Sequence, residues 1–352
     1  MNHKILIITP NLSSLNGIAI HYKGLMQYWN MDIVLFTSFK KKNNISDPII
    51  FLFSIFSFLY KLIRTNPSLI VLNTSLKRGF YSQTFYHLIA KLLRKKTVLF
   101  IHGWDTKSEH ILYSKISQII FKHLDGIFVL AQIFKYKIKT LYPQLPVFVT
   151  TTKVEDSLLN NFDIKKRIGS LNRFLFVSRI EEQKGIFLAL KIFNLINNKY
   201  PHTTFHIVGD GKAIDKVKEF IHSKNLKNVR LMGRLNGEDL SREYSNADFF
   251  FLLSSSEGMP AALLEAMAFG LPIATHPVGG IPDFFIDNKM GILSDSFDEN
   301  TYFNKIEQLM QDREKAIQIS IFNYTYAQTH FMASKVAKKM ESFFNTIILG
   351  KL

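Results

Sequence analysis

Two glutamates in the stretch SSSEGMPAALLEAMAFGLPIATHPVGG, residues 254–280, are spaced in a way that suits ligand binding. A proline suited to the first turn and Gly270 just beyond the last turn predict a helix over residues 260–270. Glu257 then lies on the loop before this helix, and Glu265 lies about a turn and a half inside it. The residues between Glu257 and the helix, with its first position, are Gly258, Met259, Pro260 and Ala261.

Backbone amides at such a helix N-terminus, reinforced by the helix dipole, form a binding site for an anion. Gly258 lets a ligand approach the backbone closely, and the carboxylates on either side could accept hydrogen bonds from hydroxyl groups. A ligand that carries a phosphate next to several hydroxyl groups would fit both features, and a nucleotide-sugar is such a ligand. On spacing alone, Glu257 and Glu265 could equally be ordinary surface charges.

Two cations follow an apolar run in the segment RFLFVSRIEEQKG. Arg179 and Lys184 would stand between a strand and the next helix, where they could clamp a diphosphate. Taken alone, this stretch is also compatible with ordinary surface cations. The segment HIVGDGK lacks the third glycine of a dinucleotide fingerprint and predicts a tight turn.

Two residues of the first half could also contribute to a site. Gly17 follows the first apolar run and could let a phosphate approach the backbone. His102, in IHGWD, stands at the end of a predicted strand. A lone histidine is more often structural than catalytic, so both interpretations of His102 stay open.

Several kinds of chemistry have no candidate residues in this chain. There is no cysteine, which excludes disulfides, thiolate catalysis and cysteine-ligated metals. No Asp-x-Asp pair and no His/carboxylate cluster with metal-ligand spacing occurs. The sequence therefore predicts neither a metal site nor a bound cofactor.

Short apolar runs alternate with helical patterns in both halves of the chain, which predicts βαβ units and open parallel sheets. A length of 352 residues favours two domains. The polar segment 150–172 interrupts the alternation. We therefore predict an α/β protein with one domain over residues 1–169, a second over 170–330, and a final helix over 331–352 that packs back on the first domain.

The net charge of +16 is concentrated in the first half. Residues 1–170 contain 23 Lys and Arg against 8 Asp and Glu, and the remaining residues contain 21 against 20. Cations mixed with apolar residues, as in FKKK, KLLRKK and FKYKIK, suit an anionic membrane surface, nucleic acid or a solvated basic face.

The apolar segment Ile49 to Ile63 is too short to span a bilayer. It predicts either a buried helix or a helix lying in a membrane surface. The N-terminal apolar run, Ile5 to Ile8, is too short for a signal peptide, so a cytoplasmic location is expected.

Taken together, EGMPAALLE, EAMAFGLPIATHPVGGIPDFF, VSRIEEQKG and IVGDG resemble the family-4 glycosyltransferases. The resemblance is specific over about residues 173–293 and looser over 1–150. It implies the GT-B fold, in which two Rossmann-like domains with parallel sheets face across a cleft. It also implies metal-independent transfer of a sugar from a nucleotide-sugar with retention of configuration.

The resemblance assigns roles to individual positions. Arg179 and Lys184 would hold the diphosphate, and Glu265 the ribose hydroxyls. Glu257 would contact the donor sugar, positioned by amides of residues 258–261. Gly17 and His102 would face the reaction from the N-terminal domain.

Two positions depart from the family pattern. TTKVED replaces a Pro-Asn-Gly-Val-Asp-like stretch, and Met259-Pro260 replaces the more usual Phe-Gly. The first departure affects the contacts expected to close the domains, and the second could reflect the choice of donor.

The function expected from the resemblance is extension of a lipid-linked saccharide in bacterial O-antigen, capsule or lipopolysaccharide synthesis. The enzyme would be peripheral on the inner face of the plasma membrane. Two alternatives compete with this function: a nucleotide-sugar epimerase of the same fold, and a non-enzymatic basic protein that binds nucleic acid. The intact set of Glu257, Glu265, Arg179 and Lys184 argues against a nucleic-acid partner.

Overall fold

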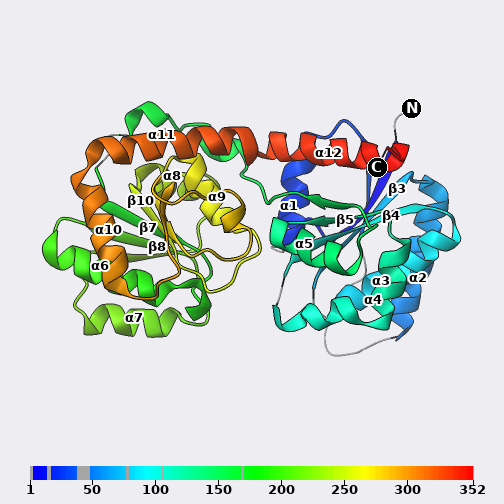
Figure 1. Ribbon diagram of the computed structural model, residues 1–352, viewed down its shortest axis with the longest axis horizontal. Coiled ribbons are helices and arrows are strands. Elements are labelled where there is room, and N and C mark those ends of the chain that lie inside the picture. Colours follow the sequence, from blue (N-terminus) through cyan, green and yellow to red (C-terminus); the bar gives the residue numbers. More distant parts are fainter. Residues whose placement is uncertain are drawn as a thin grey trace. The chain divides into compact units, whose positions relative to one another are not determined.

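The chain folds into two compact units, shown in Figure 1. The computed structural model describes residues 3–13, 17–37, 48–76, 79–104, 106–167 and 170–351. Unit 1 comprises Met1–Thr152 and Ala333–Leu352, and unit 2 comprises Lys153–Met332. The basic segment FKKK lies outside the described residues.

Unit 1 is built on a six-stranded sheet in the order β2-β1-β3-β4-β5-β6, with every neighbouring pair parallel. Its strands are β1 (Lys4–Ile8), β2 (Asp32–Phe36), β3 (Leu69–Ser75), β4 (Lys96–Gly103), β5 (Gly126–Val129) and β6 (Val147–Val149). Its helices are α1 (Gly17–Met26), α2 (Pro48–Thr65), α3 (Gly79–Leu92), α4 (Lys115–His123), α5 (Gln132–Leu141) and α12 (Ala333–Leu349), with a 3₁₀ segment η1 (Thr106–Tyr113).

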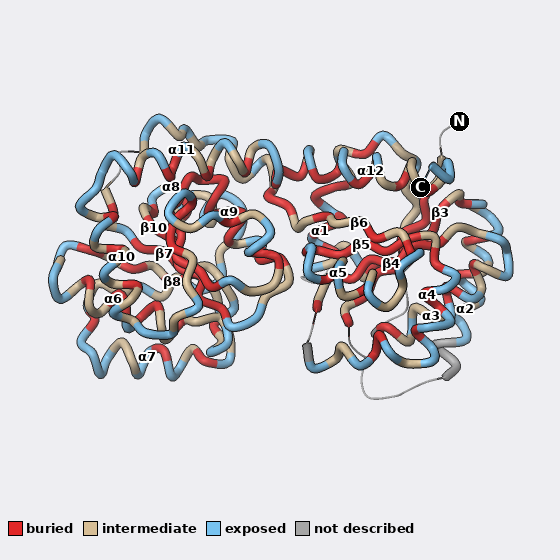
Figure 2. Tube along the Cα trace, in the orientation of Figure 1, coloured by how far each residue is buried: buried red, intermediate tan, exposed pale blue. Residues whose placement is uncertain are grey.

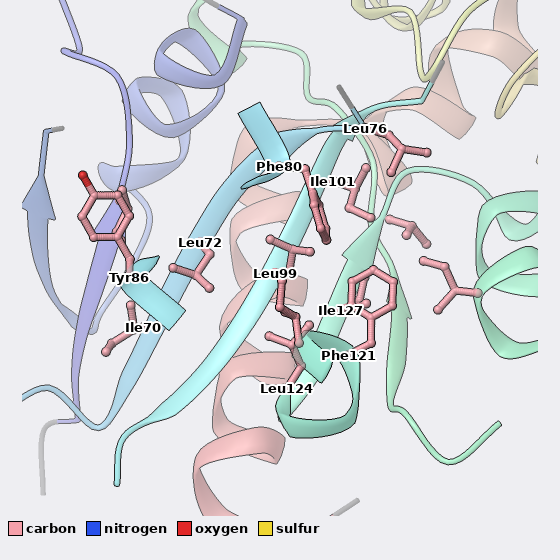
Figure 3. Packing of buried hydrophobic residues seen from close by; sticks show 14 of the residues in the cluster. Ile70, Leu72, Leu76, Phe80, Tyr86, Leu99, Ile101, Phe121, Leu124 and Ile127 are labelled. Atoms are coloured by element: carbon pink, nitrogen blue, oxygen red, sulfur yellow. The ribbon is translucent and has the colours of Figure 1, made fainter. Parts of the chain in front are cut away.

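The helices of unit 1 cover both faces of this sheet, as parallel strands require. Helices α2, α3, α4 and α5 pack on one face, where their apolar residues join those of β1, β3, β4 and β5 in one core. Figure 3 shows Phe80 and Phe121 near Leu99 and Ile127, and Tyr86 farther along the sheet beside Leu72. The opposite face carries α1 and α12.

Helix α12 returns to unit 1 after the chain has completed unit 2. The indole nitrogen of Trp29 donates to the carbonyl oxygen of Ala337 at 3.0 Å. Phe344 lies against the rings of Trp29 and Phe128. The C-terminal helix is therefore an integral part of unit 1.

Unit 2 repeats the architecture with the order β12-β11-β10-β7-β8-β9, again all parallel. Its strands are β7 (Arg173–Val177), β8 (Thr204–Val208), β9 (Val229–Gly233), β10 (Phe249–Leu252), β11 (Ile273–Thr275) and β12 (Gly291–Leu293). Its helices are α6 (Ile186–Lys199), α7 (Ile214–Ser223), α8 (Gly237–Asn246), α9 (Ala261–Ala268), α10 (Glu299–Gln311) and α11 (Arg313–His330). Figure 2 shows buried strands within each unit, in agreement with the predicted α/β class.

The division between the units falls at Thr152/Lys153, earlier than the boundary at 169/170 expected from the sequence. The polar segment after Thr152 packs on unit 2. Val154 bridges to Met332, and Arg167 donates to the carbonyl oxygens of Tyr244 and Phe269 at 2.9 and 2.8 Å. This segment is therefore held by hydrogen bonds to backbone groups far away in the sequence, and such bonds leave no periodic pattern of apolar residues.

The apolar segment Ile49 to Ile63 was predicted to form either a buried helix or a helix lying in a membrane surface, and helix α2 is buried on one side only. Phe58 and Leu62 are buried in the unit 1 core, whereas Phe53 and Phe56 are exposed. No helix within the described parts of the chain is both long enough and apolar enough to cross a bilayer.

Candidate functional site

Three of the predicted site residues of unit 2 follow strands at the carboxyl edge of its sheet. Strands β7 and β10 are hydrogen-bonded neighbours, and the chain continues from β7 to β8 in one direction and from β10 to β11 in the other. Such a switch point is where open α/β sheets bind ligands. Arg179 and Lys184 follow β7, and Glu257 follows β10.

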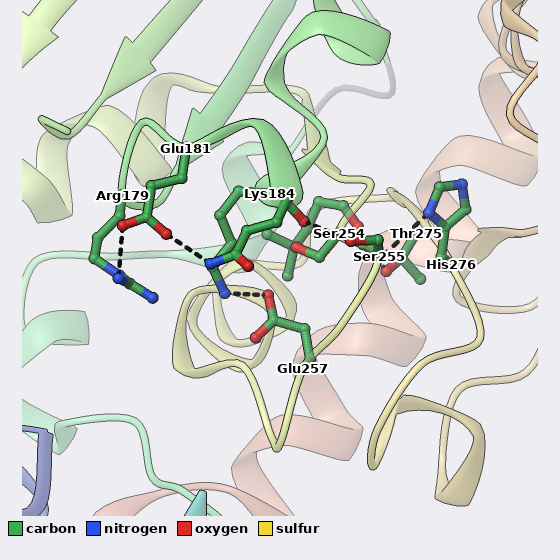
Figure 4. Close-up of polar contacts among 10 residues, drawn as sticks. Arg179, Glu181, Lys184, Ser254, Ser255, Glu257, Thr275 and His276 are labelled. Atoms are coloured by element: carbon green, nitrogen blue, oxygen red, sulfur yellow. Dashed lines mark hydrogen bonds and ion pairs between the residues drawn. The ribbon is translucent and has the colours of Figure 1, made fainter. Parts of the chain in front are cut away.

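Lys184 and Glu257 form an ion pair at this point. The ammonium nitrogen lies 2.6 Å from Oε1 of the carboxylate, and the side chains are only 13% and 8% exposed. Figure 4 shows the pair between the two loops. Because both charges are largely withdrawn from water, each depends on the other for compensation.

The loops that present this pair are tied together by their backbones. The amide of Ser255 donates to the carbonyl oxygen of Gln183 at 2.9 Å. Gly185, with φ +76°, lies so close to Leu253 that an added Cβ would fall 2.1 Å from its carbonyl oxygen. The relative position of Lys184 and Glu257 is thus fixed by main-chain contacts.

Arg179 is the more accessible cation of the site. Its side chain is 60% exposed and pairs with Oε1 of Glu181 at 2.7 Å. The other oxygen of Glu181 accepts from the Gln183 amide nitrogen at 2.7 Å. An incoming anion would therefore compete with the Glu181 carboxylate for Arg179. The sequence did not predict this role of Glu181.

Helix α9 begins at Ala261, one residue later than the predicted start at residue 260. Pro260 is the N-cap, in an extended conformation, and Ala261 is the first helical residue. The carbonyl oxygen of Pro260 accepts from the amides of Leu263 and Leu264. The side chain of Met259 is buried.

Glu265 lies inside α9, as predicted. Its Oε2 accepts a hydrogen bond from the Tyr244 hydroxyl at 2.9 Å. Burial raises the pKa of Glu265 above its ordinary value, and the Tyr244 bond and the charge of Lys153 act in the opposite direction. Tyr244 stands in the polar segment REYSNAD, where nothing in the sequence indicated this contact.

The Gly279-Gly280 turn supports the loop that carries Glu257. The amide of Gly280 donates to the carbonyl oxygen of Gly258 at 2.7 Å. Gly279 has φ +59°, and a Cβ there would lie 2.1 Å from the carbonyl oxygen of Glu257. The turn therefore packs its backbone directly against the backbone of the site.

We expect Gly279→Ala to lower both the melting temperature and any activity of unit 2, because Glu257 would have to move. Gly237→Ala is the matched control, since Gly237 has φ +55° but a Cβ added there would meet nothing within 4 Å. Calorimetry of the two variants separates the contact from the backbone strain that both share. Equal melting temperatures would show that the Gly279 contact is unimportant.

In unit 1, His102 belongs to a hydrogen-bonded cluster at the carboxyl edge of the sheet. The Asn73 amide nitrogen donates to the carbonyl oxygen of Ile8 at 2.8 Å. Its Oδ1 therefore accepts from the Tyr22 hydroxyl at 2.7 Å and from His102 Nε2 at 2.8 Å. This arrangement places a proton on Nε2 and leaves Nδ1 as an acceptor.

Burial, with a contribution from His21, lowers the pKa of His102 well below its ordinary value of 6.5. The imidazole is therefore neutral at pH 7. Gly17, the first residue of α1, is exposed, and a Cβ added to it would meet nothing within 4 Å. Asn73 and Tyr22 were not predicted, although a polar Asn inside the apolar run LIVLNTS was a usable signal.

Neither a metal-binding cluster nor the cavity at the other edge of the sheet offers a better candidate site. Within the described ranges, no group of three or more His, Asp and Glu is placed to hold a metal ion. A cavity of about 470 Å³ lies at the amino edge of the unit 2 sheet, lined in part by Arg167, Arg173 and Asp248. Arg167 is already engaged by backbone carbonyl oxygens, so the carboxyl edge is the better candidate.

A family model matches most of unit 2. Residues 160–324 match the family model of the glycosyl transferases group 1, and this stretch contains every predicted donor residue of unit 2. Gly17 and His102 lie outside it. The match covers less than half of the chain, so it applies to unit 2 and not to the whole protein.

Two curated relatives extend the similarity into unit 1. The chain is 26% identical over 251 residues to the amylovoran biosynthesis glycosyltransferase AmsK of Erwinia amylovora, covering 68% of this chain and 61% of that protein. It is 25% identical over 299 residues to the O-antigen biosynthesis glycosyltransferase WbnH of Escherichia coli, covering 83% and 80%. The chain thus spans less than two thirds of the amylovoran relative.

Among solved structures, Anabaena HepE in complex with UDP is similar over almost the entire chain. The TM-score is 0.75 at 14% sequence identity, with 98% of this chain and 100% of that chain covered. At this identity the likeness shows the fold alone. The chain therefore has the two-unit α/β fold of the GT-B type, and these two relatives are named as glycosyltransferases of amylovoran and O-antigen biosynthesis.

Proposed function

We propose that this chain is a retaining, metal-independent family-4 glycosyltransferase that moves a sugar from a nucleotide-sugar to a saccharide acceptor. The observation that carries the proposal is the buried Lys184–Glu257 pair beside Arg179 at the β7/β10 switch point. Two cations, a carboxylate and a helix N-terminus meet the needs of a diphosphate joined to a sugar.

Each residue has a role in this proposal. Arg179 and Lys184 hold the diphosphate and stabilise the negative charge that develops on the leaving group. When Lys184 turns to phosphate, Glu257 is released to accept hydrogen bonds from donor-sugar hydroxyls. Glu265 accepts from the ribose hydroxyls, and the amides of residues 258–261 assist in positioning.

Unit 1 contributes His102 and Gly17 in the same proposal. The neutral His102 offers Nδ1 as a hydrogen-bond acceptor for a sugar hydroxyl. The open space at Gly17 accommodates a ligand close to the backbone. Gly17→Ala is then expected to keep stability while lowering transfer, because the added methyl group would meet only the ligand.

We further propose that the acceptor is a lipid-linked saccharide in bacterial surface-polysaccharide synthesis and that the enzyme works peripherally on the cytoplasmic face of the membrane. The functions of the two relatives, amylovoran and O-antigen biosynthesis, support the first statement. The basic first half of the sequence supports the second.

The first test is thermal unfolding with UDP, the nucleotide bound by Anabaena HepE. A ligand at 100 times its Kd stabilises the native state by about 2.7 kcal/mol. We expect Glu265→Gln to weaken UDP binding about tenfold or more, because hydrogen bonds to a charged group are lost. Glutamine can still accept the Tyr244 hydrogen bond, so folding should change little.

Glu307→Gln is the matched control. Glu307 also lies on a helix of unit 2 and accepts a tyrosine hydroxyl, that of Tyr200 at 2.8 Å, but it stands on α10. A UDP effect lost equally in both variants would contradict the assignment of Glu265. No stabilisation by UDP, GDP or ADP in folded protein would contradict the proposed function. Product analysis without an acceptor separates transfer from epimerisation.

A further inference from the structure

Helix α2 is apolar on two sides, but only one side is covered by the chain. Phe58 and Leu62 are buried in the core of unit 1. The outward side carries large apolar residues on successive turns, each more than half exposed: Leu52, Phe53, Phe56, Tyr60 and Ile63. A helix that is hydrophobic all round is normally buried, so this outward side calls for a partner.

The exposed apolar surface continues over the neighbouring helices. Helix α3 packs between α2 and α4 on the same face of the sheet, as Figure 1 shows. Leu88 and Leu92 of α3 and Ile116 and Ile119 of α4 are exposed. We use "outer face" for the exposed apolar residues of α2, α3 and α4.

The two units differ sharply in this respect. Among the described residues, sixteen large apolar side chains of unit 1 are exposed, against three in unit 2, namely Ile286, Phe297 and Ile321. Scattered exposed apolar residues are normal on a soluble surface, whereas a contiguous patch marks an interaction site. Exposed large apolar side chains are therefore concentrated in unit 1 and are not a general property of this chain.

The two units also differ in net charge. The sequence of unit 1 contains 23 Lys and Arg against 6 Asp and Glu, a net charge of +17, and unit 2 contains 21 against 22, a net charge of −1. Arg64 at the end of α2 and Lys115 and Lys122 of α4 are exposed. In the described parts of the chain, none of these three forms an ion pair with a carboxylate.

We propose that the outer face binds an anionic lipid bilayer, with α2, α3 and α4 lying along its surface. Apolar side chains enter the boundary between headgroups and acyl chains while the flanking cations meet anionic headgroups. A second copy of the chain would fit less well, because two faces of strongly positive units would repel each other. This proposal rests on the proposed function, since it names the surface by which the enzyme would reach a lipid-linked acceptor.

Flotation of the full chain with vesicles tests the proposal. We expect binding to vesicles of phosphatidylglycerol and phosphatidylcholine, and much weaker binding to phosphatidylcholine alone. Phe53→Ser with Phe56→Ser should weaken binding at least about tenfold, since two phenyl rings no longer leave water. Replacing Arg64, Lys115 and Lys122 by glutamine should weaken it about 100-fold on anionic vesicles.

Two single variants provide a matched comparison. Leu52 and Leu349 are 52% and 55% exposed, but Leu349 is on α12, at the opposite face of the unit 1 sheet. Leu52→Ser should weaken vesicle binding and Leu349→Ser should not. Equal effects of the two, or no flotation of the wild-type chain, would overturn the proposal.

The remaining outcomes separate this proposal from the proposed function. The Phe53/Phe56 variant should keep its stabilisation by UDP, because the donor site is in unit 2. Vesicle binding without any nucleotide binding would leave the docking surface standing and reject the glycosyltransferase. A dimer that this variant converts to monomers, without vesicle binding, would assign the outer face to a second copy and overturn the lipid proposal.

Discussion

Lys184→Met is expected to lower sugar transfer by at least about 100-fold, because a cation placed against the leaving diphosphate contributes mainly to the transition state. It should also lower the free energy of unfolding of unit 2 by about 3 kcal/mol, since Glu257 is left as a largely buried charge without its partner. The expected destabilisation follows from the low exposure of both side chains, 13% and 8%.

The double variant Lys184→Met with Glu257→Gln separates the two effects. Removing both charges also removes the uncompensated one, so we expect stability to return to within about 1 kcal/mol of the wild type. Transfer should stay at the level of the worse single variant. Calorimetry measures the stability, and transfer of a labelled sugar measures the activity.

Arg179→Gln is the control for a cation of the same site that is exposed. The Arg179 side chain is 60% exposed and that of its partner Glu181 is 21% exposed, and pairs open to solvent contribute about 0 to 1 kcal/mol. This variant should lose transfer while keeping its melting temperature.

If the double variant of Lys184 and Glu257 regained transfer together with stability, the Lys184–Glu257 pair would be purely structural and the proposed site would be wrong.

The positions of those candidate-site residues that depend on local structure could be predicted from the sequence. Arg179 and Lys184 follow β7 directly, and Glu257 precedes α9, so a strand, a loop and a helix signal were sufficient to place each of them. Their convergence follows from the neighbouring positions of β7 and β10 in the sheet. The alternation of apolar runs predicted parallel sheets, although not this strand order.

Contacts between distant segments were not predictable in the same way. Tyr244 reaches Glu265 from α8, and Gly279 meets the backbone of Glu257 from the loop after β11. Neither residue type signals its partner. The predicted boundary at 169/170 lies later than the division at Thr152/Lys153 for the same reason, because Arg167 is held by backbone carbonyl oxygens that no local pattern reveals.

The exposure of α2 shows a third limit. Its apolar composition was compatible with a buried helix or a membrane-surface helix, and periodicity does not distinguish them when both sides are apolar. The structure shows that Phe58 faces the core while Phe53 and Phe56 do not. The sheet can cover only one side of a helix, so the composition of α2 exceeds what its own unit can bury.

Unit 1 is expected to lose stability as the pH falls from 7 to 5, because it buries neutral histidines. His87 lies in the core beside Thr97, with Nδ1 3.0 Å from the hydroxyl oxygen. Burial, with the charge of Lys91 and nearby His123, lowers the pKa of His87 from 6.5 to about 4. Burial also lowers the pKa of His102, which adds to the effect.

The direction follows from proton binding in the two states. In the unfolded chain His87 takes up a proton as the pH falls through about 6.5, whereas in the folded chain it does so only near pH 4. Between these values the unfolded state binds more protons, so its relative free energy falls. Each pH unit in this window is worth up to about 1.4 kcal/mol, and the expected loss from His87 is about 2 kcal/mol by pH 5.

Urea unfolding followed by tryptophan fluorescence measures this loss in unit 1 alone, since the two tryptophans of the chain, Trp29 and Trp104, both belong to that unit. His87→Gln can keep a hydrogen bond to Thr97 but binds no proton, so its pH dependence should be flatter by about 2 kcal/mol over the same interval. His110→Gln, at an exposed position, controls for removal of an imidazole from the surface. Parallel curves for the wild type and His87→Gln would mean that the core of unit 1 accepts a proton at His87 without unfolding. In that case the Lys91 and His123 charges beside His87 would have to be compensated by Asp125, which pairs with Lys91 at 2.6 Å.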